Sequence, residues 1–163
     1  MKTLNDNKKT LTISSQAVLF IERKMMRKPD SQQRSLAGEY YVAFILSRMG
    51  YDISVTIGRA KMFDMIALGS SGRSINIQVK STYSYYDWLV AHEFDSSTNS
   101  VVALVRLGKD ATQKPELYFL PGEKANKLRT HKYINHSPRI SRADVRREFQ
   151  DHNYELIEHL LRE

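Results

Sequence analysis

Three polar residues could together hold a metal ion beside a phosphate: Asp64, Gln78 and Lys80. Gln78 and Lys80 belong to the alternating run at residues 74–80, whose two-residue period is typical of a strand and puts both side chains on one face. Asp64 interrupts an apolar run at residues 62–68 that is typical of a buried strand, where an unpaired carboxylate is costly. A carboxylate, an amide oxygen and an ammonium on neighbouring strands could hold a hard cation beside a charge stabiliser.

The two runs are separated by a four-residue loop, Gly-Ser-Ser-Gly at residues 69–72. Turn-forming residues in a loop of this length predict a β-hairpin, which brings Asp64 close to Gln78 and Lys80. A structural alternative is an ion pair between Asp64 and Lys80 across the hairpin, with Gln78 simply exposed. Because buried ion pairs rarely improve stability over apolar residues, we favour the metal site.

A fourth candidate, Glu39, lies in the segment that precedes the hairpin. Residues 36–49 are apolar on nearly all sides and end before Gly50, a frequent residue type after a helix C-terminus, so they predict a largely buried helix. Glu39 aligns with Val42 and Leu46 at helical spacing, which puts a carboxylate on a packed face. It is either a salt-bridged structural glutamate or a member of the same site, and the sequence leaves both interpretations open.

The order of Glu39, Asp64 and the Gln-x-Lys motif at residues 78–80 resembles the PD-(D/E)XK nuclease superfamily. The core of that superfamily begins with a helix that often carries a glutamate, followed by strands that bear an aspartate and then an acid-x-lysine motif. The chain is most similar to the branch with Gln-x-Lys, which includes Holliday-junction-resolvase-like and intron-encoded endonucleases. The resemblance covers residues 35–82 well and residues 100–130 loosely.

Two residues depart from the family pattern. Phe63 replaces the proline, which contributes no ligand, and Gln78 replaces the acid of the acid-x-lysine motif. A glutamine oxygen can still bind a hard cation, but it brings no charge. Metal affinity would therefore depend more strongly on Asp64, on Glu39 and on the phosphate of the substrate.

The resemblance implies an α/β fold with a restriction-endonuclease-like core, in which helices flank a mixed central β-sheet. We assign this core to residues 35–130, preceded by an N-terminal basic arm and helix at 1–34 and followed by a C-terminal basic helical extension at 131–163. The other expected elements are strands at 51–57, 101–105 and 116–120, short helices near 123–129 and after a capping box at 141–144, and a closing amphipathic helix with Leu156, Ile157, Leu160 and Leu161.

The resemblance further implies a metal-dependent endonuclease that hydrolyses DNA phosphodiester bonds. Asp64, Gln78 and Glu39 would hold Mg²⁺, for which Mn²⁺ would substitute, and Lys80 would be the catalytic cation. Cleavage of both DNA strands on such a scaffold normally needs two sites, so a homodimer or higher oligomer is expected. The alternative function is a non-catalytic nucleic-acid-binding or assembly module that keeps the nuclease fold, which the neutral Gln78 leaves open.

The composition agrees with a nucleic-acid partner without requiring one. The 163 residues carry a formal net charge of +7, which favours a polyanionic partner such as DNA, although a soluble basic interaction protein has the same composition. There is no cysteine, so disulfides and thiolate metal sites are excluded and a cytoplasmic location is expected. No signal sequence or membrane span is recognisable, and we expect no membrane partner.

Basic residues concentrate toward the C-terminus. Between Lys124 and Arg147 there are eight lysines or arginines and one acid, Asp144. Contact with phosphates is one use of such a stretch, and a solvated surface is the other. The residues expected to contact nucleic acid are Arg59, Lys61, Lys124, Lys127, Arg129, Lys132, Arg139 and Arg142.

An aromatic cluster follows the Gln-x-Lys motif, with Tyr83, Tyr85, Tyr86 and Trp88. These side chains could stack on nucleic-acid bases or widen a groove. Clusters of this kind are more often core or subunit contacts, and we favour that interpretation here.

Overall fold

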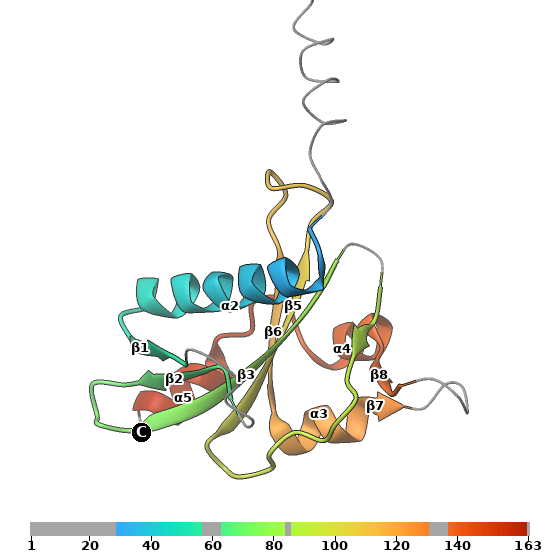
Figure 1. The fold of residues 1–163 in the computed structure, drawn as a ribbon. Helices are drawn as coiled ribbons and strands as arrows, with labels where there is room; N and C mark the ends of the chain where they lie inside the picture. Colours follow the sequence, from blue (N-terminus) through green and yellow to red (C-terminus); the bar gives the residue numbers. More distant parts are fainter. Residues whose placement is uncertain (1–28, 57–62, 84–85, 131–136, 163) are drawn as a thin grey trace, which may run out of the picture.

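A computed structural model describes residues 29–56, 63–83, 86–130 and 137–162 of the chain (Figure 1). Several expectations from the sequence lie outside these residues: the basic N-terminal segment before Pro29, and the candidate DNA contacts Arg59, Lys61 and Lys132. No helix among the described residues is long and apolar enough to cross a membrane.

The described part of the chain contains one long helix, eight strands and three short helices. In chain order they are α2 (Ser31–Arg48), β1 (Asp52–Val55), β2 (Met65–Leu68), β3 (Ser74–Tyr83), β4 (Trp88–Leu89), β5 (Ser100–Leu107), β6 (Glu116–Pro121), α3 (Gly122–Leu128), β7 (Arg129–Thr130), β8 (Arg139–Ile140), α4 (Arg142–Glu148) and α5 (Glu155–Arg162).

The centre of the fold is a mixed five-stranded sheet in the order β1-β2-β3-β5-β6. Strands β3 and β5 are parallel, and the other neighbouring pairs are antiparallel. The expected hairpin is confirmed, because β2 and β3 pair antiparallel with Met65 opposite Ile77. The expected α/β fold, with helices flanking a mixed sheet, is therefore what the structure has.

Two apolar clusters lie on the two faces of this sheet. The first joins α2 and α5 to the sheet, with Val42 and Leu46 from α2 and Ile157 and Leu161 from α5 all fully buried. The second lies beneath α3, α4 and the small sheet β4-β8-β7, which Figure 1 shows across the central strands from α2. Residues 137–162 contribute side chains to both clusters, so the C-terminal segment completes the core.

Trp88 is the largest side chain of the second cluster. It is fully buried, and its indole N–H donates to the carbonyl oxygen of Val105 at 2.9 Å. The core contact that we favoured for the aromatic cluster is thus correct for Trp88. Tyr86 differs, because 65% of its surface is exposed.

The expectation of a largely buried helix at 36–49 was wrong. The helix begins at Ser31, after a capping box between Asp30 and Gln33, and only one side of it packs on the sheet. The helix has more apolar residues than fit on the side that packs against the sheet. Leu36, Tyr40 and Phe44 therefore form an exposed stripe at four-residue spacing. Their exposed fractions are 45%, 60% and 53%.

The capping box expected at residues 141–144 is also absent. Ser141 is the N-cap of α4, but its side chain makes no capping hydrogen bond. The backbone N–H of Arg142 instead donates to the carboxylate of Asp87 at 3.2 Å. An acid that is distant in the sequence therefore takes the place of the local cap at this helix start.

Candidate functional site

Asp64 is fixed by both strands beside it. It lies one residue before β2, and its backbone N–H donates to the carbonyl of Ile77 at 2.9 Å. On the other side its carbonyl accepts from the backbone N–H and the hydroxyl of Thr56, both at 2.9 Å. The main chain of Asp64 is thus held between the strand segments on either side of it.

The carboxylate of Asp64 continues the ladder between β2 and β3. Its Oδ2 accepts from the backbone N–H of Val79 at 2.7 Å, which aims the carboxylate at the Gln-x-Lys strand. Within the described residues, Oδ1 makes no hydrogen bond and remains available as a ligand. Because Met65 lies opposite Ile77, the register brings Asp64 level with Gln78.

Strand β3 alternates as the sequence predicted. Ile75, Ile77 and Val79 are buried in the first cluster, whereas Gln78 and Lys80 are half-buried on the other face. The polar side chains therefore leave the sheet at the point where Asp64 approaches it.

Glu39 reaches this place because α2 comes unusually close to β3. A Cβ atom added to Gly38 would lie 1.7 Å from the Ser81 hydroxyl oxygen and 2.9 Å from the Ser81 Cβ. A side chain at Gly38 would therefore push the helix away from the strand, and the glycine allows Glu39 to lie near Lys80.

The electrostatics of Glu39 show which groups share the site. Burial raises the pKa of the Glu39 carboxyl, the neighbouring Asp64 carboxylate raises it further, and Lys80 partly offsets both effects. A partly buried glutamate whose ionised form is disfavoured by a neighbouring carboxylate marks a place that a further cation would stabilise. The structure thus brings together the four residues Glu39, Asp64, Gln78 and Lys80 from three separate elements.

The donors at this site suit a hard cation. Asp64, Glu39 and the amide oxygen of Gln78 are all oxygen ligands, which Mg²⁺ prefers. Across the described ranges, no group of three or more histidine, cysteine, aspartate or glutamate side chains could hold a metal ion. Any metal at the site would therefore depend on the amide oxygen or on ligands from a substrate.

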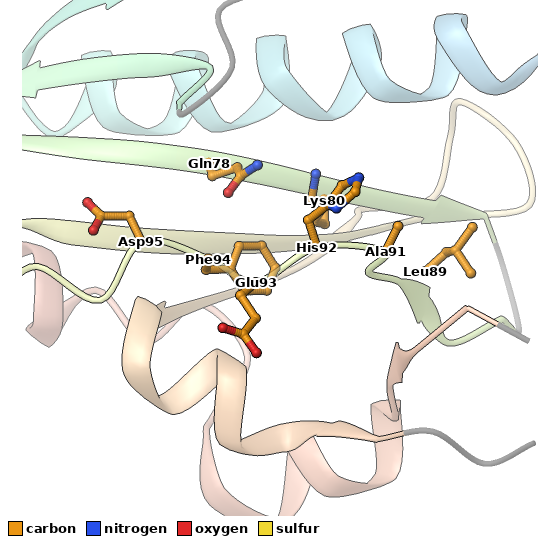
Figure 2. A pocket seen from close by; sticks show the side chains of 8 residues that line it. All are labelled: Gln78, Lys80, Leu89, Ala91, His92, Glu93, Phe94 and Asp95. Atoms are coloured by element: carbon orange, nitrogen blue, oxygen red, sulfur yellow. The ribbon is translucent and has the colours of Figure 1, made fainter. Parts of the chain in front are cut away.

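A pocket of about 510 Å³ opens beside the Gln-x-Lys strand (Figure 2). Gln78 and Lys80 form one wall, and the segment from Leu89 to Asp95 forms the other. Asp64 and Glu39 do not line this pocket, so they approach Lys80 from outside it. A group bound in the pocket at Lys80 would face the 89–95 segment.

The described fold is similar to that of an endonuclease. A bacterial homing endonuclease, I-Ssp6803I, matches over 80% of this chain and 93% of its own, with a TM-score of 0.52 and 14% sequence identity. Likeness at this identity concerns the fold alone. No protein-family model and no curated protein sequence matches the chain.

Four of the five candidate DNA contacts that the structure describes form ion pairs with acids. Lys124 pairs with Glu148, Lys127 with Glu123, Arg129 with Glu93 and Arg142 with Glu116. Arg139 lies on β8 and is half-buried. Contact of these residues with DNA stays a prediction, and for the four paired ones it would compete with an existing ion pair.

Arg142 is the most firmly held of these cations. Its guanidinium and that of Arg106 each make two hydrogen bonds to the Glu116 carboxylate, at 2.5 and 3.0 Å. These two cations overcome burial and lower the pKa of Glu116 to about 2. The sequence could not show this pair, because Glu116 is 26 residues away on another element.

Sequence reasoning missed the pocket wall at residues 89–95. The segment has no regular spacing and belongs to no motif, so nothing in the sequence connects it with Lys80. Its place beside the site follows from the path of the chain after β4, which only the structure shows.

Proposed function

We propose that this protein is a metal-dependent endonuclease that hydrolyses DNA phosphodiester bonds, of the Gln-x-Lys branch of the PD-(D/E)XK superfamily. The observation that carries the proposal is the hydrogen bond from the Val79 N–H to the Asp64 carboxylate at 2.7 Å, which holds Asp64 against the Gln-x-Lys strand. Asp64 and Lys80 are also the two charged groups that act on the raised pKa of Glu39. The likeness to a homing-endonuclease fold and the net charge of +7 support it.

Asp64, Glu39 and the amide oxygen of Gln78 would hold Mg²⁺, with Mn²⁺ as a substitute. When bound, such an ion would polarise the phosphate and make a water molecule more acidic. The hydrogen bond from Val79 fixes Asp64, so this ligand is positioned before substrate arrives.

Lys80 places an ammonium in the pocket beside Gln78. There it would contact a non-bridging oxygen of the scissile phosphate and stabilise the negative charge that grows during attack. Its half-buried position favours this role, because electrostatic stabilisation is stronger where water is partly excluded.

The proposed enzyme also includes a second copy of the chain. One site of this size can cleave one phosphodiester bond at a time. Cleavage of both DNA strands therefore requires a homodimer or higher oligomer. The exposed stripe on α2 (Leu36, Tyr40 and Phe44) lies on the helix that carries Glu39 and offers an apolar surface for such an assembly.

The alternative is a module that binds nucleic acid and retains the fold without cutting. The neutral Gln78, together with the lack of a three-acid cluster among the described residues, favours this alternative. It predicts DNA binding that depends on salt but not on Mg²⁺.

A cleavage assay separates the two functions. Genomic and supercoiled plasmid DNA would be incubated with full-length protein and Mg²⁺ or Mn²⁺, and new DNA ends would be mapped by sequencing. We expect discrete ends with wild type, a loss of at least about 100-fold with Asp64→Asn or Lys80→Ala, and no loss with Arg73→Ala. Arg73 is an exposed cation in the β2–β3 turn and so controls for charge alone.

Binding of Mn²⁺ to the protein without DNA would be measured in parallel by titration calorimetry. We expect Asp64→Asn to weaken it while leaving the fold intact, because an asparagine oxygen can still accept the Val79 N–H. Equal cleavage by wild type, Asp64→Asn and Lys80→Ala would contradict the endonuclease proposal. Salt-sensitive binding without any metal-dependent ends would support the non-catalytic alternative.

A further inference from the structure

The wall of the pocket that faces the Gln-x-Lys strand carries three side chains able to exchange protons: His92, Glu93 and Asp95. None of them belongs to the nuclease motif. Figure 2 shows the imidazole of His92 directed toward the Lys80 side chain, whereas the carboxylate of Glu93 points away from β3.

Both acids on this wall are already engaged. Glu93 forms an ion pair with Arg129 at 3.1 Å. Asp95 accepts hydrogen bonds from the hydroxyl and the backbone N–H of Ser97, and these bonds lower its pKa. Neither carboxyl group is suited to give a proton to a substrate.

His92 differs from both acids. It is exposed within the pocket and has no hydrogen bond, ion pair or ring contact with any other described residue. Its ring nitrogens are therefore unoccupied by the rest of the described chain. Lys80 and His92 line the same pocket, so a substrate group bound there at Lys80 would lie in the space that the imidazole also faces.

We propose that His92 is a further catalytic residue of the site and donates a proton to the leaving oxygen of the scissile phosphodiester. This inference rests on the proposed endonuclease function. A water oxygen forms a bond to phosphorus, the bond from phosphorus to the deoxyribose oxygen breaks, and that oxygen keeps the electron pair. It takes the proton from an imidazolium N–H of His92, while the attacking water releases one proton to solvent.

The distribution of charges explains why a separate acid is useful here. Lys80 and a bound metal ion would stabilise the charge on the phosphate, but they would not give a proton to the alkoxide that departs on the opposite side. Histidine is the side chain that most often performs such a transfer, and a positioned acid contributes about 10²–10⁴-fold in rate.

The test uses the DNA site found by end mapping, in two forms. One duplex has the ordinary phosphodiester, and the other has sulfur in place of the leaving bridging oxygen, a substitution that gives a leaving group needing no proton. Single-turnover rates with excess full-length protein and Mn²⁺ would be measured for wild type, His92→Ala, Lys80→Ala and His159→Ala. His159 is an exposed histidine on α5 and serves as the matched control.

We expect His92→Ala to cut the ordinary duplex about 100-fold more slowly than wild type, and the sulfur duplex within about threefold of wild type. Lys80→Ala should be slow on both duplexes, and His159→Ala slow on neither. Binding of the ordinary duplex with Ca²⁺ in place of Mn²⁺ should change less than about threefold in His92→Ala, because the acid acts after binding.

Three outcomes would overturn the assignment of His92. Normal cleavage of the ordinary duplex by His92→Ala excludes a catalytic role, and equal losses on both duplexes show that the residue does not serve the leaving group. A loss explained by weaker DNA binding makes His92 a phosphate contact instead. A wild type that cuts neither duplex nor any other DNA overturns the endonuclease proposal itself, which distinguishes the two failures.

Discussion

At the scale of single residues, the site is a compromise between stability and function. Glu39 is partly buried beside another carboxylate, so its ionised form is disfavoured in the folded protein. Stability is therefore highest when this carboxyl is protonated, and it falls as the pH rises through the raised pKa. A bound metal ion would favour the ionised carboxylate of Glu39 and so offset this loss of stability.

Glu39→Gln should accordingly raise the melting temperature at pH 7 in EDTA, by less than the roughly 4 °C that 1 kcal/mol gives in a chain of this size. The gain should vanish near pH 4, where the wild-type carboxyl is protonated. Excess Mg²⁺ should stabilise the wild type and not the variant. Thermal unfolding at the two pH values measures this, and a wild type that is more stable than Glu39→Gln in EDTA would contradict it.

The sequence predicted much at this scale, for identifiable reasons. Strand alternation placed Gln78 and Lys80 on one face, and the short loop at 69–72 placed Asp64 beside them. Both inferences rest on local geometry, which sequence spacing determines. The ion pairs of Glu116 and the position of His92 in the pocket with Lys80 depend on residues distant in the chain, so no local pattern could indicate them.

At the scale of elements, the close contact between α2 and β3 decides where Glu39 lies. An alanine in an ordinary helix position would stabilise the protein by about 1 kcal/mol relative to glycine. At Gly38 its Cβ would overlap Ser81, so the expected sign is the opposite.

Gly38→Ala should lower the free energy of unfolding by about 1–3 kcal/mol, as overpacking does, and slow DNA cleavage by about 10- to 100-fold because Glu39 is displaced. Ser81→Ala should be neutral or slightly stabilising, since it removes a buried hydroxyl without a hydrogen-bond partner. Urea unfolding and cleavage rates of the two single variants and the double variant measure the coupling. Purely additive effects would exclude this contact as the cause.

The ion cluster of Glu116 with Arg106 and Arg142 joins β5, β6 and the start of α4. The pKa of Glu116 is lowered from its ordinary value of 4.5 to about 2. The cluster therefore stabilises the fold fully at pH values above 4.5, and this stabilisation is lost as the pH falls toward 2. The side chain of Glu116 is 19% exposed, so solvent screens the cluster only partly.

Glu116→Gln should cost about 2–3 kcal/mol of unfolding free energy at pH 7, and this difference from wild type should shrink between pH 5 and pH 2.5. Urea unfolding across that range measures it. Glu123→Gln, which removes an exposed acid paired with Lys127, is the control and should change little. A difference that is constant with pH would show that lost packing, not charge, is responsible.

The degree of burial of α2 shows where prediction from the sequence failed. Its apolar residues are spread around the helix, which by periodicity alone indicates burial on all sides. The structure covers one side, because the sheet and α5 can bury only residues such as Val42 and Leu46. The pattern of apolar residues in one chain does not separate those that pack in the core from those that stay exposed, such as Leu36, Tyr40 and Phe44.

At the scale of the whole molecule, the exposed stripe on α2 is the surface that we propose for contact with a second copy of the chain. Leu36, Tyr40 and Phe44 lie along one edge of the helix, with the guanidinium of Arg48 over the Phe44 ring at 5.6 Å. Large apolar side chains in a contiguous exposed patch mark interaction sites more often than chance.

The double change Tyr40→Glu and Phe44→Glu should shift the protein from dimer to monomer at micromolar concentration, with little change in its unfolding free energy. Light scattering coupled to size-exclusion chromatography measures the mass. Ser47→Glu, an exposed position on the same helix, should leave the mass unchanged. A wild type that is monomeric at every concentration would refute the assembly and leave the stripe without a function.

For the whole molecule, the endonuclease proposal depends on whether the four residues Glu39, Asp64, Gln78 and Lys80 gather around a metal ion. Anomalous diffraction from crystals of the full-length protein with Mn²⁺ tests this most directly. We expect one strong peak about 2.1 Å from Asp64 Oδ1, with the amide oxygen of Gln78 at a similar distance. A structure at the same Mn²⁺ concentration with no peak at Asp64, or with Lys80 bonded directly to the Asp64 carboxylate, would contradict the account.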